Sequence, residues 1–175
     1  MKRWAILLLA LALLAAASAA LGAGPRGSRG NPYPIRTTVR LPAGQGWKLR
    51  VNKSIPNATR LVLDWNRFNT PPKGGHQFFI INITLAYSGK GSASPFAPTH
   101  LFAVGRSKVE YSMVDDSCGG SVRGQLNFAT KVVAGGRITG NVCFSVWKTD
   151  VRSLLHIYET SPLTGKAAKV YFRVR

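Results

Sequence analysis

Hydrophobic and polar residues alternate along most of the chain beyond residue 35, with the two-residue period of β-strands. The longest alternation covers residues 76–88 (HQFFIINITLAYS), and a second covers 137–147 (RITGNVCFSVW). In the first, five apolar residues share one face: Phe79, Ile81, Ile83, Leu85 and Tyr87. In the second, Ile138, Val142, Phe144 and Val146 point inward, while Cys143 points outward. Each pattern predicts a strand with one face on a core.

Shorter alternations predict further strands at 36–41, 47–52, 60–66, 100–104, 108–112, 122–128, 154–159 and 169–175. Those at 60–66 and 122–128 are the least regular, and 100–104 with 108–112 reads as a hairpin around Gly105-Arg106. The 18 Gly and 10 Pro fall between the strands and argue against long helices. Short strands separated by turns, without βαβ alternation, predict an all-β antiparallel sandwich or barrel over residues 35–175.

The N-terminus has a different pattern. Lys2 and Arg3 precede an unbroken apolar run over residues 4–17, and Ala17-Ser18-Ala19 offers small residues for cleavage. These features predict a signal peptide over 1–19, followed by a Gly/Pro-rich flexible linker over 20–34. The alternative is an uncleaved membrane anchor, because the uncharged stretch continues to Gly24. No cysteine follows the run, which excludes a lipoprotein anchor. We therefore expect a secreted or otherwise extracytoplasmic protein.

The chain contains two cysteines, Cys118 and Cys143. In an exported protein an even cysteine count favours a disulfide. Cys118 lies in the loop DDSCGGS, and Cys143 lies on the outward face of its predicted strand. The bond would therefore attach a loop to the outside of the sheet instead of crossing the core. The alternative is two free thiols.

Candidate catalytic groups are few. Ser145 and Lys148 match an S-x-x-K motif, but on a strand these positions point to opposite faces. Asp115 and Asp116 supply too few oxygens for calcium. The three histidines, His76, His100 and His156, are too widely spaced for a recognisable metal motif. We expect no enzyme, no catalytic residue, no metal and no cofactor, with a small hydrolase as the remote alternative.

Charge is the strongest compositional feature. The chain has 24 Lys+Arg against 6 Asp+Glu, for a net charge of +18. Seven basic residues fall on outward faces of predicted strands: Arg36, Arg40, Lys48, Arg50, Lys169, Arg173 and Arg175. One sheet face could thus attract polyanions such as anionic lipids, at a membrane surface, or cell-wall polymers. The alternative is a solvated basic surface without a specific ligand. No nucleic-acid motif is present, so we expect no specific nucleic-acid partner.

Two segments resemble a known family. Residues 75–89 (GHQFFIINITLAYSG) and 133–146 (VAGGRITGNVCFSV) are similar to two signatures of bacterial exported immunoglobulin-like domains of unknown function, related to the immunoprotective extracellular antigen. Tyr87-Ser88 stands where the family usually has Asn, and Trp147 where Pro is common. The resemblance covers about residues 45–174 and implies an immunoglobulin-like β-sandwich without established catalytic residues.

Together these observations predict an exported, non-catalytic binding module of the bacterial envelope or extracellular space. Its partner is expected to be an unknown protein or an envelope polyanion. The alternative function is polyanion binding through the basic sheet face.

Overall fold

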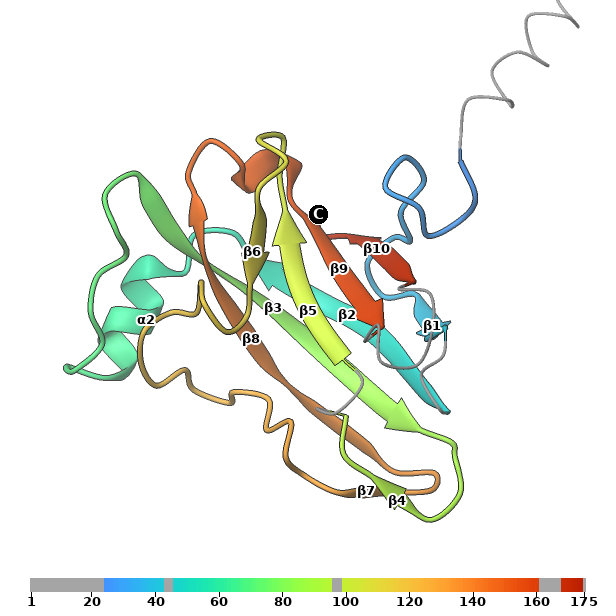
Figure 1. Cartoon of the computed structure of the whole chain (residues 1–175). Helices are drawn as coiled ribbons and strands as arrows, with labels where there is room; N and C mark the ends of the chain where they lie inside the picture. The colour runs from blue at the N-terminus through green and yellow to red at the C-terminus, as the bar shows by residue number, and fades with distance from the viewer. Residues whose placement is uncertain (1–23, 43–45, 96–98, 161–167, 175) are drawn as a thin grey trace, which may run out of the picture.

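The structure is a computed structural model that describes residues 24–42, 46–95, 99–160 and 168–174. Two four-stranded antiparallel sheets pack face to face, with β5, β6 and β9 in front of β2, β3 and β8 in Figure 1. The first sheet has the order β1 (Thr38–Arg40), β2 (Trp47–Ile55), β3 (His76–Tyr87) and β8 (Arg137–Trp147). The second has the order β10 (Lys169–Arg173), β9 (Leu155–Thr160), β5 (Thr99–Val104) and β6 (Glu110–Ser112).

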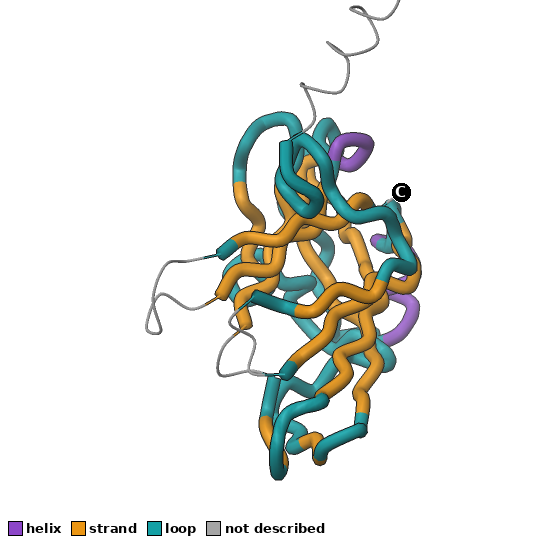
Figure 2. The backbone as a smooth tube through the Cα atoms, turned by 90° about the vertical axis from the view of Figure 1, so that its right-hand side faces the viewer, coloured by secondary structure: helices purple, strands orange, loops and turns teal. Residues whose placement is uncertain are grey.

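Three smaller elements complete the described fold. β4 (Ser92–Ala93) pairs with β7 (Val132–Val133), α2 is a short helix (Thr59–Trp65), and η1 is a 3-10 turn (Val151–Ser153). The loops gather at the two ends of the strands (Figure 2). Loops at the ends of a rigid sandwich leave the outer sheet faces as the broad surfaces of the molecule.

The order of the strands is that of an immunoglobulin-like sandwich. The chain crosses from β3 in the first sheet to β5 and β6 in the second, returns to pair β8 with β3, and then adds β9 and β10 beside β5. Such crossovers between two antiparallel sheets are the Greek-key connections of this class. The predicted all-β antiparallel sandwich is therefore confirmed.

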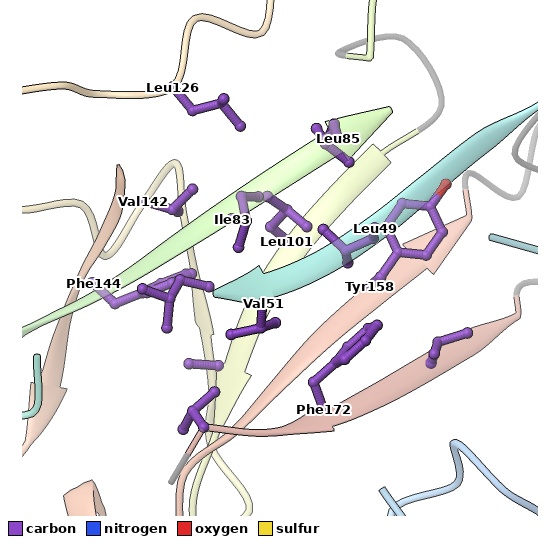
Figure 3. Packing of buried hydrophobic residues seen from close by; sticks show 14 of the residues in the cluster. Leu49, Val51, Ile83, Leu85, Leu101, Leu126, Val142, Phe144, Tyr158 and Phe172 are labelled. Carbon is purple, nitrogen blue, oxygen red and sulfur yellow. The ribbon is translucent and has the colours of Figure 1, made fainter. Parts of the chain in front are cut away.

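The core lies between the sheets and follows the predicted alternation. Leu49, Ile83 and Phe144 of the first sheet are fully buried against the second sheet, which contributes Leu101, Tyr158 and Phe172 (Figure 3). The β3–β8 pairing extends in register from His76–Trp147 to Ala86–Arg137, so the two strongest sequence patterns form neighbouring strands, with β8 at the edge of the first sheet. Burial of side chains of this size stabilises by about 2 kcal/mol each.

A second apolar cluster covers one end of the outer face of the first sheet. It consists of Ala58, Val62, Phe78, Ile80, Cys118, Val122 and Cys143. Helix α2, beside β3 and β8 in Figure 1, supplies Val62. This end of the outer face is therefore covered, whereas no such cluster of the described residues lies over the end near Ala86 and Arg137.

The predicted strand at 60–66 is wrong, because residues 59–65 form helix α2. Tertiary contacts hold this helix: the Ala58 amide donates to the Phe78 carbonyl at 2.8 Å, and the Phe78 amide donates to Thr59 Oγ1 at 3.0 Å. A seven-residue helix is too short to be stable alone. Packing on β3 decides its conformation.

The predicted strand at 122–128 is also wrong. Its only ladder contact is an isolated bridge from Gln125 to Asn141, and Gly124 has a φ of 65° that ends an extended course. Leu126 and Phe128 nevertheless point into the main core. The apolar residues that alternate there belong to a loop whose side chains pack into the core between the sheets.

Residues 24–34, expected as part of a flexible linker, are instead hydrogen-bonded along β10. The Tyr171 amide donates to Gly27 O at 2.8 Å. The Tyr33 amide donates to Tyr171 O at 2.9 Å, and the Arg173 amide donates to Tyr33 O at 2.7 Å. The Tyr33 ring lies against Phe172, with centroids 5.8 Å apart. These contacts cover the open edge of the second sheet.

The predicted signal peptide at 1–19 lies outside the described residues. Within the described ranges, no helix is both long and apolar enough to cross a membrane.

Candidate polyanion-binding surface

The structure places five of the seven predicted basic residues in strands, and it divides these five between the two sheets. Arg40, Lys48 and Arg50 lie on the outer face of the first sheet, whereas Lys169 and Arg173 lie on the outer side of β10 in the second. Exposed Arg36 precedes β1, and Arg175 lies outside the described residues. The expectation of one basic sheet face holding all seven is wrong, because alternation distinguishes inward from outward but not one sheet from the other.

Lys169 also differs in its partners. Its Nζ lies 2.8 Å from Glu110 and 3.4 Å from Glu159, and the hydrogen bond to Glu110 is the main reason that the pKa of Lys169 is raised. A lysine neutralised by two carboxylates is a poor anion site. Lys169 therefore contributes little to a basic surface.

The first sheet carries a compact basic surface on its open end. Arg40 is opposite Lys48, Lys48 is opposite Ala86, and Ala86 is opposite Arg137, so these residues form one row across all four strands. The next row contains Arg50, and Lys53 lies opposite the outward Asn82 beyond the bulge in β2. We call Arg40, Lys48, Arg50, Lys53 and Arg137 the basic face.

Neutral polar side chains between these cations bond to one another. Asn52 Nδ2 donates to Asn82 Oδ1 and to Thr84 Oγ1, both at 2.9 Å, and Asn82 Nδ2 donates to Asn141 Oδ1 at 2.8 Å. Thr84 Oγ1 and Thr139 Oγ1 are 2.8 Å apart. These neutral side chains are held in place by bonds to one another. In these hydrogen bonds, none of them bonds to a cation of the basic face.

All six acidic residues of the chain are described, and each is engaged elsewhere or lies in another region. Asp64 pairs with Arg60 at 3.6 Å, Glu110 and Glu159 pair with Lys169, and Asp150 is buried. Asp116 Oδ2 accepts the Ser112 amide at 2.9 Å in the loop that also holds Asp115. No carboxylate side chain therefore neutralises the basic face.

Sequence reasoning missed Lys53 and Arg137 as members of this surface. The alternation placed Arg137 outward, but its place beside Lys48 depends on the pairing of β2, β3 and β8. Lys53 follows a register shift between Val51 and Lys53 that no alternation reveals.

The predicted disulfide is present between Cys118 and Cys143, with Cα atoms 5.6 Å apart. As predicted, it joins the loop after β6 to the outward face of β8, and both cysteines belong to the second apolar cluster. Both cysteines are buried, and Cys143 lies six residues along β8 from Arg137.

A polar cavity of about 170 Å³ lies over the α2 end of the same sheet, and its lining includes Lys73, His76, Asp116 and Ser145. His76 Nδ1 is 3.2 Å from Gly74 O, and the His76 ring lies against Trp147 with centroids 4.1 Å apart. Among the described contacts none joins Ser145 to His76, so the hydrogen-bonded nucleophile and base of a hydrolase are not assembled. In the same residues no group of three His, Cys, Asp or Glu could hold a metal ion.

His156 lies inside the main core. It is 1% exposed, and its ring centroid is 6.3 Å from those of Phe144 and Phe172. Burial lowers the pKa of His156 to about 3. It is a structural histidine with no access to a ligand.

Acid should destabilise the fold through His156. Below the ordinary pKa of 6.5 the unfolded state binds a proton that the folded state does not, so stability falls as the pH drops from 6.5 toward about 3. We expect the free energy of unfolding of His156→Leu, relative to that of the wild type, to rise by about 2 kcal/mol when the pH is lowered from 7.5 to 5. Urea unfolding at the two pH values measures this change. His156→Gln, which is polar but does not titrate, should show the same flatter pH profile from a lower stability. Parallel pH profiles for wild type and His156→Leu would contradict this assignment.

No protein-family model matches this chain, and neither does any curated protein. Solved structures that are similar to it include the following three. A conserved hypothetical protein from Bacillus anthracis has 8% identity and a TM-score of 0.43, with 79% of this chain and 94% of that one covered. The yjhA protein from Bacillus subtilis has 12% identity and a TM-score of 0.45, with 82% and 99% covered.

The third is an uncharacterized β-sandwich protein from Clostridium difficile 630, with 9% identity and a TM-score of 0.47, covering 87% of this chain and 100% of that one. The class that the strands themselves define is an antiparallel β-sandwich with a basic outer face. The three similar proteins are described without a function, and they add no ligand to that class.

Proposed function

We propose that this protein is an exported, non-catalytic binding module that binds polyanions through the basic face. The observation that carries the proposal is the row Arg40–Lys48–Ala86–Arg137, in which three cations cross one sheet without a carboxylate partner. Like charges directly opposite each other on neighbouring strands are destabilising. Arg40 and Lys48 are such a pair, and a bound anion would relieve their repulsion.

The chemistry of these side chains suits anionic oxygens. Arginine presents a planar fork that binds phosphate, sulfate or carboxylate in a bidentate manner, whereas lysine acts as a point charge. Several cations together also raise the local concentration of a polyanion and release its counterions on binding. Affinity should therefore fall as salt rises, in proportion to the number of contacts.

The test is a charge-reversal variant, Arg40→Glu with Lys48→Glu and Arg50→Glu. We expect the exported protein to lose at least tenfold in affinity for heparin at physiological salt, because half or more of the cations of the basic face are inverted. The salt dependence of binding should flatten at the same time. The measurement is isothermal titration over a series of salt concentrations.

The matched control inverts three exposed cations at the opposite end: Arg106→Glu, Lys148→Glu and Arg152→Glu. It changes the net charge by the same amount but leaves the basic face intact, so it should retain most of the affinity. Equal losses in the two variants would mean that net charge alone attracts the ligand, and the proposal would be wrong.

A further inference from the structure

We propose that the ligand is a single linear polyanion with hydroxylated units, which lies across the strands over Ala86. This inference rests on the polyanion binding proposed above and adds the shape and chemical class of the ligand. Sulfated polysaccharides and phosphodiester-linked sugar or polyol polymers share this chemistry.

The first argument is the spacing within the row. Neighbouring strands lie about 4.8 Å apart, so Arg40 and Lys48 are about 5 Å apart at their backbones, Lys48 and Arg137 about 10 Å, and the whole row about 14 Å. Ala86 is the only short side chain in the row. We place the polymer backbone in the gap that long cations on either side of the Ala86 methyl group would leave.

The second argument is the chemistry of the neighbouring row, which contains Thr38, Arg50, Thr84 and Thr139 in register. The Thr84 and Thr139 hydroxyls are bonded to each other, and Asn52 donates to Thr84. Hydroxyl groups at fixed positions beside the gap offer donors and acceptors to the hydroxyls of a sugar or polyol. Arg50 is the one charged member of this row, and the other three are threonines. We therefore expect the ligand to carry its anionic groups at intervals, with hydroxylated units between them.

A lipid surface fits these features less well. A flat bilayer meets the tips of protruding cations and gains nothing from a gap at Ala86. Surfaces that bind membranes usually add apolar side chains that enter the headgroup layer. Large apolar residues exposed in the described part of the chain are Phe68, Val109, Val114, Val133 and Trp147, and none belongs to the two rows.

The discriminating variant is Ala86→Ile, which fills the gap without changing any charge and suits a strand. The probes are heparin oligosaccharides and glycerol phosphate oligomers of increasing length, and vesicles containing phosphatidylglycerol. For the wild type we expect oligomer affinity to rise with length and to level off once the oligomer spans the row. Ala86→Ile should bind oligomers at least tenfold more weakly and vesicles unchanged, with an unaltered thermal midpoint.

Ala129→Ile serves as the control, because it adds the same side chain at an exposed position outside the rows. The heparin and glycerol phosphate series distinguish a sulfated polysaccharide from a phosphodiester polymer. Unchanged oligomer affinity in Ala86→Ile, or an equal loss for oligomers and vesicles, would overturn the inference and leave polyanion binding standing. Full binding of every probe by the charge-reversal variant would overturn the proposed function itself.

Discussion

Replacing both cysteines by serine is expected to lower the free energy of unfolding by about 3.5 kcal/mol. The Cys118–Cys143 bond closes a loop with a sequence separation of 25 residues, and removing it restores the conformational freedom of that loop in the unfolded chain. The two serine hydroxyls would also be placed in the apolar cluster with Phe78 and Ile80. Guanidinium unfolding followed by tryptophan fluorescence measures the difference.

Reduction of the wild-type protein provides the control, since it removes the bond without placing hydroxyls in the cluster. Binding to the basic face should survive the double substitution, because Cys143 and Arg137 are six residues apart on β8, about 20 Å along the strand. A double variant as stable as the oxidised wild type would contradict the role of the bond. Loss of polyanion binding in a folded double variant would contradict the separation of the two regions.

The second large effect is expected at Asp150, which is 2% exposed where the β5–β6 and β8–β9 connections meet. Its Oδ2 accepts the Tyr111 hydroxyl at 2.8 Å and the Ser107 hydroxyl, and its Oδ1 accepts the Ser107 amide at 3.0 Å. Asp150→Ala leaves the buried Tyr111 hydroxyl without its acceptor. We expect a loss of about 3 kcal/mol, because hydrogen bonds to a charged group contribute about 1.5 to 3 kcal/mol each.

The pH dependence of this loss has a defined sign. Burial opposes ionisation of Asp150, but the hydrogen bonds from Ser107 and Tyr111 outweigh it, so the pKa of Asp150 is lowered. Its contribution is therefore present above the ordinary pKa of 3.8 and is lost as the pH falls through the lowered value. The gap between wild type and Asp150→Ala should be constant from pH 7 to pH 5 and should close in stronger acid.

Two further variants check this cluster. Tyr111→Phe removes one hydrogen bond and should lose less than Asp150→Ala. Gly105→Ala should also destabilise, because a Cβ at Gly105 would lie 2.3 Å from Asp150 Cγ. Asp150→Ala with wild-type stability at pH 7 would show that the carboxylate is not a structural group.

Much of the sandwich is predictable from alternation because its longest strands are covered on one face by a core. Strands 76–87 and 137–147 appear in the sequence almost at their structural bounds. The disulfide is expected from the even number of cysteines, and the alternation adds only its position, because it places Cys143 on the outside of its strand. Local patterns suffice wherever burial on one side decides the conformation.

The errors occur where contacts distant in sequence decide the conformation. Helix α2 depends on β3, the 122–128 loop depends on the side of the core, and residues 24–34 depend on β10. The basic face was predictable as a set of outward cations but not as one surface. Lys169 and Lys48 have the same local pattern, and only the strand order separates them.

The most direct measurement of the central claim is a backbone amide NMR titration of the protein with a heparin oligosaccharide at physiological salt. Polyanion binding through the basic face predicts concentration-dependent shifts at Arg40, Lys48, Arg50, Ala86 and Arg137, with Lys169 and Arg173 on the opposite sheet unmoved. Shifts centred on β10, or spread evenly over every exposed cation, would contradict the proposed function.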